Sequence, residues 1–289
     1  MEITVRKYIP IENLPSGSGI AKVGDSYYVI GDDAPFLYHL NNEFELISKI
    51  PLLDSAHFDG ERIIKSEKPD FETLELIGEN ELVIFGSGSK SPQRDIFVRI
   101  LLGELIIERY NISEFYDNIR NLPIMGDSEL NIEATAYQSG LIYLFNRKKN
   151  LIIKILYKDL LAFIKGEIPF PKPEIAQFLL PKINGVEAGF SGATTLKTNT
   201  KIIFTASVEN THNAYDDGEI LGSFIGVIDI SNGGLSEVFK YCEIPYTEMN
   251  LKVESVTIDE EIANGITKVV LITDDDKGNS TIIEALLTY

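Results

Sequence analysis

The sequence predicts an all-β fold, a five-bladed β-propeller with four strands in each blade. Two observations carry this prediction. A short motif that opens with Ser or Glu recurs five times at nearly even spacing, and alternating apolar and polar runs typical of hairpins follow each copy. The copies are Ser18–Ala21, Glu72–Glu75, Glu133–Ala136, Ser191–Thr194 and Glu254–Thr257. Their starts lie 54, 61, 58 and 63 residues apart, and 53 more residues lead past residue 289 back to Ser18. A repeat that fills the chain in this way indicates units arranged in a ring.

Each motif should form the innermost strand of a blade, and a polar turn and a second strand should follow it. The second strands are expected at Tyr27–Ile30, Leu82–Phe85, Leu141–Phe145, Lys201–Phe204 and Lys268–Ile272. Third and fourth strands are clearest at Asp95–Leu101 with Glu104–Tyr110, and at Phe224–Ile230 with Leu235–Tyr241. Four strands per blade follow from this order.

Three segments outside the repeat complete the prediction. Leu156–Ile164 has the best helical periodicity and should form a short helix on a blade connection. The Pro-rich stretch Ile168–Pro173 should be an extended loop. The first run, Ile3–Tyr8, and the last run, Thr281–Leu287, should meet in one blade, because a ring closed by both ends of the chain has no exposed edge.

Composition limits the classes of function. The length of 289 residues suits a single propeller domain over residues 1–289, and the formal charge of −18 disfavours a nucleic-acid partner, which needs clustered Lys and Arg. Cys242 is the only cysteine, so no internal disulfide can form. The N-terminus has no apolar run suited to a signal peptide, and no segment approaches 18 uncharged apolar residues. We therefore expect a cytoplasmic protein without a membrane partner, or a periplasmic or secreted one if a leader was removed.

The motif starts are the first candidate for chemistry. In a propeller the innermost strands line the central channel, so Ser18, Glu72, Glu133, Ser191 and Glu254 should form one ring. Three carboxylates confined together repel one another, and either protons or a cation must intervene. Calcium suits such a ring, since it takes six to eight oxygen ligands in irregular geometry, whereas His39, His57 and His212 are too scattered for a zinc site. The alternative is a polar ring that only lines a wet channel.

The order Ser, Glu, Glu, Ser, Glu resembles that of the calcium-activated nucleotidases, or apyrases, which are five-bladed propellers with one calcium ion on the axis. Local segments are similar too: Gly189–Ser191 with Lys201–Phe204, Glu133–Ala134 with Tyr143–Arg147, and Val253–Glu254. The resemblance implies that Ca²⁺ is the cofactor and that the five ring side chains are its ligands.

The nucleotide-handling residues match that family less well. Arg147 and Glu209 stand where the family has Arg and Glu, but Thr205–Ser207 replaces a basic residue expected shortly before Glu209. Separately, Asp70–Glu72 with Gly86–Ser91 and Arg94 resembles a group of uncharacterised bacterial propellers akin to phytase-like esterase domains.

These resemblances imply a metal-dependent hydrolase of phosphoanhydrides or esters, with a small anionic substrate. In that case Arg94 and Arg147 would clamp the anion, and Asp70 or Glu209 would act as the base. Lys68 and His212 would bind substrate at the same mouth. Each of these residues has a simpler alternative as a member of a loop ion pair. The rival function is a non-enzymatic propeller with a structural axial calcium ion that binds a protein or glycan partner.

Overall fold

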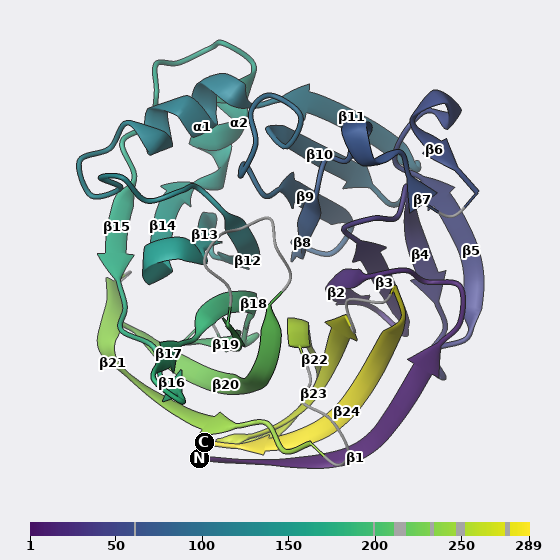
Figure 1. The fold of residues 1–289 in the computed structure, drawn as a ribbon, viewed down its shortest axis with the longest axis vertical. Coiled ribbons are helices and arrows are strands. Elements are labelled where there is room, and N and C mark those ends of the chain that lie inside the picture. The colour runs from purple at the N-terminus through teal and green to yellow at the C-terminus, as the bar shows by residue number, and fades with distance from the viewer. Residues whose placement is uncertain (61, 199, 211–217, 232–233, 247–251, 275–277) are drawn as a thin grey trace.

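The chain forms five antiparallel four-stranded sheets, which are arranged radially around one axis (Figure 1), so the predicted five-bladed propeller is confirmed. The computed structural model describes the whole chain except residues 61, 199, 211–217, 232–233, 247–251 and 275–277. Within the described residues, no helix is both long and apolar enough to cross a membrane.

Each blade is built outward from the channel. Blade 1 consists of β2 (Gly17–Val23), β3 (Ser26–Gly31), β4 (Phe36–Leu40) and β5 (Leu46–Pro51). Blade 2 consists of β8 (Phe71–Ile77), β9 (Glu81–Gly86), β10 (Ile96–Leu101) and β11 (Ile106–Asn111). Blade 3 consists of β12 (Ile132–Gln138), β13 (Leu141–Asn146), β14 (Leu151–Leu156) and β15 (Glu174–Gln177). Blade 4 consists of β18 (Gly189–Thr195), β19 (Lys201–Asn210), β20 (Glu219–Ser231) and β21 (Gly234–Glu243).

Blade 5 contains both ends of the chain, as predicted. Its inner strands are β22 (Lys252–Ala263), β23 (Ile266–Asp274) and β24 (Ser280–Thr288), and its outer strand is the N-terminal β1 (Glu2–Ile11). The two ends pair antiparallel over their full length, from Glu2 opposite Thr288 to Ile11 opposite Ser280. The N- and C-termini consequently lie side by side at the rim (Figure 1).

Short elements decorate the connections between strands. The predicted helix is present as α2 (Tyr157–Ile164), whereas α1 (Ser113–Arg120) was not expected. Phe115, Tyr116 and Ile119 are the buried residues of α1, and this spacing on one helical face is the signal that could have revealed it. Two small hairpins, β6 (Phe58–Asp59) with β7 (Arg62–Ile63) and β16 (Lys182–Ile183) with β17 (Val186–Glu187), were also not foreseen. The remaining elements are the single 3₁₀ turns η1 (Ser55–His57), η2 (Lys65–Glu67) and η3 (Lys148–Asn150).

Five hydrophobic clusters hold the blades together, one at each boundary between neighbours. Between blades 2 and 3, for example, Phe97 and Val83 pack with Leu144 and Ile153, and α1 covers the same cluster. The boundary between blades 5 and 1 is built in the same way from Val29, Tyr38 and other residues of blade 1 against Val270 and Ile282. In the part of the chain that the structure describes, each hydrophobic cluster draws on two blades, so burial of apolar area requires the neighbouring blade.

Candidate functional site

A β-bulge opens the inner strand of every blade. At each of these places the pairing register skips one residue, which is the additional residue of the bulge. The five skipped residues are Ser18, Glu72, Glu133, Ser191 and Glu254, the same five that the sequence repeat singles out. A bulge re-aims its side chain and recurs beside functional sites. We call the end of the channel that carries these five residues the upper mouth.

The two serines of the ring connect neighbouring blades. Ser18 Oγ donates a hydrogen bond of 2.5 Å to the carbonyl of Phe71, the residue before Glu72. Ser191 Oγ donates one of 2.6 Å to the carbonyl of Val253, the residue before Glu254. Their hydroxyl protons are therefore used between blades, and only the oxygen lone pairs remain for a ligand.

Glu133 is buried and shares its charge with an arginine. Its Oε1 accepts a hydrogen bond of 2.6 Å from Asn131, and its Oε2 lies 3.3 Å from an Arg147 nitrogen. The other end of the Arg147 guanidinium lies 3.1 Å from Glu209. Burial raises the pKa of Glu133 to about 7, although Arg147 opposes this shift, and the nearby Glu254 adds to it. Arg147 thus lies between two carboxylates at the boundary of blades 3 and 4.

The other two ring carboxylates differ in the charge that lies beside them. Glu254 lies 3.2 Å from the Lys252 ammonium. Glu72 instead faces further acids, because one oxygen each from Asp32, Asp70 and Glu72 lie within 4.8 Å of one another. Burial raises the pKa of Glu72 well above its ordinary value, and the charges of Asp70, Glu133, Asp32 and Glu254 raise it further. The charge of Glu254 thus raises the pKa of both Glu72 and Glu133.

Two cations hold the acids around Glu72. Lys68 Nζ lies 2.5 Å from Asp32, 2.9 Å from Asp33 and 3.3 Å from Asp70. Arg94 lies 2.5 Å from the second oxygen of Asp70. Burial nevertheless raises the pKa of Asp32 to about 6, despite the opposing charge of Lys68. Among the described residues, Asp32 Oδ1 is buried and has no hydrogen-bond partner.

Some of the residues beside the ring occupy equivalent positions on three blades. The backbone amides of Asp32, Ser87 and Arg147 each donate to the carbonyl of the residue two before the ring residue, at 3.0, 2.9 and 2.8 Å. That same position, two before each ring residue, holds Ser16, Asp70, Asn131, Gly189 and Lys252. Sequence reasoning missed Asp32, Asn131 and Lys252 as site residues, and this second periodic position is the signal that could have found the last two.

The predicted residues meet as follows. Lys68, Asp70 and Arg94 form one ion-pair network on blade 2 and its preceding loop, and Arg147 with Glu209 forms another at blades 3 and 4. Each network is joined to the ring, the first through the cluster with Glu72 and the second through Glu133. His212 lies outside the described residues.

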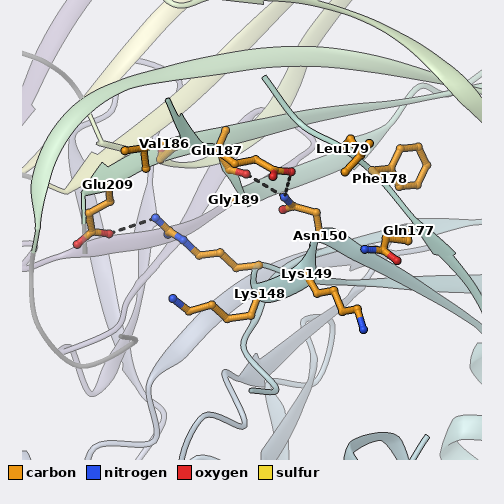
Figure 2. Close-up of a pocket in the computed structure, with 13 residues that line it drawn as sticks. Lys148, Lys149, Asn150, Gln177, Phe178, Leu179, Val186, Glu187, Gly189 and Glu209 are labelled. Atoms are coloured by element: carbon orange, nitrogen blue, oxygen red, sulfur yellow. Dashed lines mark hydrogen bonds and ion pairs between the residues drawn. The ribbon is translucent and has the colours of Figure 1, made fainter. Parts of the chain in front are cut away.

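A cavity of about 270 Å³ adjoins the second network (Figure 2). It is lined by Arg147, Lys148, Glu187 and Glu209 among others, and Leu179 at its edge is 80% exposed. Asn150 connects its walls, since its side-chain amide donates to Glu187 at 3.2 Å and to the Ala188 carbonyl at 2.9 Å. The cavity is therefore polar, with both signs of charge on its walls.

The fold and this site define a class: five-bladed β-propellers whose channel opens into a mouth of buried, ion-paired carboxylates. The chain belongs to a family of unknown function, DUF6929, whose model matches residues 13–287. No curated protein matches the sequence.

Two solved structures are similar to this chain at low sequence identity. Glutaminyl cyclase from Myxococcus xanthus is 9% identical with a TM-score of 0.52, and the match covers 99% of this chain and 97% of that one. Virginiamycin B lyase from Staphylococcus aureus is 12% identical with a TM-score of 0.47, with coverage of 99% and 100%. The likeness to the cyclase concerns the fold alone, and the resemblance to apyrases stays a prediction.

Proposed function

We propose that the upper mouth binds a calcium-type divalent cation and that the loaded mouth hydrolyses a small phosphoanhydride or ester. The observation that carries the proposal is the cluster of Asp32, Asp70 and Glu72, which includes a buried Asp32 oxygen without a partner among the described residues. A buried acceptor that lacks a donor is costly, and close carboxylates require a proton or a cation between them.

The charge balance at the cluster favours a bound cation. Asp32, Asp33, Asp70 and Glu72 are four carboxylates, and three cations among the described residues lie against them: Lys68, Arg94, and Arg62, which is 3.4 Å from Asp33. One formal negative charge therefore remains when every acid is ionised. A bound cation would offset it, and burial together with the neighbouring carboxylates raises the pKa of Glu72.

The donors available are those that calcium prefers. Carboxylate oxygens dominate the mouth, and the ring serines can add hydroxyl lone pairs. The two described histidines are engaged elsewhere: His39 stacks on Tyr28 with ring centroids 4.6 Å apart, and His57 lies 3.5 Å from Glu67. The residues present thus fit a hard, oxygen-seeking ion better than zinc.

When bound, such an ion would polarise a phosphoryl or carbonyl oxygen and lower the pKa of a coordinated water. Arg147 and Arg94 would orient the anion through their paired N–H donors. Glu209 or Asp70 would accept the proton of the attacking water. For the arginines to do this, the carboxylates that now hold them must exchange part of that contact for the substrate.

That last condition favours a second candidate function. Arg94 contacts Asp70, and Arg147 contacts both Glu133 and Glu209. Arginines that are held by these ion pairs neutralise the carboxylates of the mouth and keep the side chains there in place. A non-enzymatic propeller with a structural cation, which offers the same face to a protein or glycan, would keep these pairs intact.

The first experiment measures calcium binding by isothermal titration and by the melting temperature, with a chelator as the blank. Wild-type protein should bind one equivalent of calcium and should melt at a higher temperature when calcium is present. At a calcium concentration 100 times the dissociation constant, the bound ion should add about 2.7 kcal/mol to the free energy of unfolding. Glu72→Gln should lose both effects, and Glu43→Gln, which changes an exposed acid on blade 1, should keep them. Wild-type protein that binds no calcium would refute the cation site.

The second experiment separates the two functions. Phosphate release from nucleoside di- and triphosphates, and release of product from phosphate and carboxylate esters, would be measured with calcium and with chelator. Calcium-dependent turnover that disappears in Glu72→Gln supports the hydrolase. Calcium binding without turnover of any of these substrates supports the structural cation and the binding function.

A further inference from the structure

The channel has a second chamber, with polar and apolar walls, at the end opposite the upper mouth. All five inner strands line a cavity of about 360 Å³ there, through residues three or more positions beyond the ring. Three residues of a strand span about 10 Å, so this chamber is separate from the cluster around Glu72. We call it the lower chamber and define it by Ala21, Glu75, Tyr137, Thr194 and Thr257.

Glu75 is the buried acid of the lower chamber. The residue is only 7% exposed, and its Oε1 accepts a hydrogen bond of 3.1 Å from the backbone amide of Tyr137 on blade 3. Burial raises the pKa of Glu75 well above its ordinary value, and that single amide is the group that opposes the shift. No described cationic side chain lies within ion-pair distance of it.

The repeat shows that a carboxylate is not needed for this contact between blades. Thr257 occupies the position in blade 5 that Glu75 occupies in blade 2, three residues after the ring residue. Its hydroxyl accepts a hydrogen bond of 3.1 Å from the amide of Lys22, which is the blade 1 equivalent of Tyr137. A threonine therefore makes the same contact, and the second oxygen and the charge of Glu75 are in excess of what the fold requires.

The same position also explains why the chamber is open. It holds Ala21, Ala136, Thr194 and Thr257 on the other four blades, and small side chains leave room at the axis. The remaining walls are partly apolar, with Leu76, Leu196 and Ile258 among them. Two lysines also line the chamber: Lys22 forms an ion pair with Asp259 and also donates to its carbonyl at 3.1 Å, and the backbone amide of Lys197 donates to Glu261.

We propose that the lower chamber binds a small organic cation with a primary ammonium group, which donates to Glu75 while its hydrocarbon body packs on the apolar walls. An ammonium supplies the charge that a buried carboxylate lacks, and its remaining protons can be shared with threonine hydroxyls. A divalent metal ion fits poorly, because calcium needs six to eight oxygen ligands and Glu75 is the one carboxylate among the lining residues. A chamber of this volume lies within the usual range of small-molecule sites.

The test is isothermal titration of the full chain with n-butylammonium chloride, with n-butanol as the neutral analogue of the same shape. Wild-type protein should bind the ammonium and not the alcohol. Glu75→Gln, which keeps an acceptor for Tyr137, and Glu75→Thr, which copies blade 5, should each weaken binding at least about tenfold. Glu79→Gln removes an exposed acid four residues away and should leave binding unchanged.

Each of these results would overturn the proposal: no binding of butylammonium to wild-type protein, equal binding to Glu75→Thr, or equal binding of n-butanol. Competition by sodium chloride at the same concentration would assign the site to an inorganic ion instead and would also refute it. Far-ultraviolet circular dichroism of both Glu75 variants checks that loss of binding is not loss of fold. Calcium binding at the upper mouth is measured in the same samples, so failure of one site is distinguishable from failure of the other.

Discussion

The Arg147 side chain packs closely against Gly189 at the start of blade 4. A Cβ atom at Gly189 would lie 2.4 Å from Arg147 Cγ, closer than such atoms approach in proteins, and 3.0 Å from its Nε. Glycine at this position therefore matters for the arginine rather than for a special backbone angle. The position lies two before a ring residue, where other blades carry Asp70, Asn131 or Lys252.

Gly189→Ala should consequently displace Arg147 from Glu133 and Glu209. We expect a loss of about 1–3 kcal/mol in the free energy of unfolding, typical of added bulk in a packed site, measured by urea denaturation. Gly103→Ala is the matched control, because nothing lies within 4 Å of its Cβ position. In an Arg147→Ala background the Gly189 substitution should have little further effect, and an undiminished effect there would contradict this explanation.

The acid of the lower chamber should make stability depend on pH. The pKa of Glu75 is raised in the folded state, so the folded protein holds this proton more tightly than the unfolded chain. The stabilisation that this group contributes is therefore at its full value below the pKa of Glu75 in the unfolded chain, near 4.5. It is lost as the pH rises toward the pKa of Glu75 in the folded protein. Glu75→Gln should not show this loss of stability, because glutamine does not titrate.

The prediction is a difference between two melting curves. Glu75→Gln and Glu79→Gln should melt alike near pH 4, and Glu75→Gln should become progressively the more stable of the two as the pH rises to 8. Scanning calorimetry across this range is the measurement. A constant difference, or one of opposite sign, would mean that Glu75 is ionised and compensated in the folded protein without added ligand.

At the scale of the element, β1 and α1 show two different limits of sequence reasoning. The pairing of the two ends could be predicted, because a propeller without it would expose the edge of β24. Helix α1 was missed, because its eight residues lie in a blade connection where the strand repeat gives no guidance. Its apolar face is short and is completed by the cluster between blades 2 and 3.

Removal of residues 1–11 should open the ring and strongly lower the melting temperature. The truncated chain would expose β24 as an edge strand and uncover part of the cluster that contains Ile3. A synthetic peptide with the sequence of residues 1–11 should restore stability by adding back as a strand, and a scrambled peptide should not. A truncated protein that melts like wild type would show that β1 contributes little to closure.

At the scale of the whole molecule, the repeat predicted both the number of blades and which five residues surround the axis. Even spacing sufficed, since equivalent residues of radial units must converge. The spacing could not reveal that each is the additional residue of a bulge, because a bulge depends on the register between two strands. Nor could it reveal that Asp32 lies beside Glu72, because Asp32 belongs to another blade and its place depends on how the segment after β3 approaches the mouth.

The closing blade also sets an order of events during synthesis. Strand β1 is synthesised before the other strands of the ring, yet its partner β24 is completed only about 280 residues later. At a translation rate of roughly 5–20 residues per second, β1 waits about 14–56 s before it can pair. Throughout that time the nascent chain carries an unsatisfied strand and blade boundaries that are still incomplete. A chain that stops before residue 280 would leave β1 permanently without its partner, so such a truncation should yield a product recognised by chaperones and proteases rather than a smaller working ring.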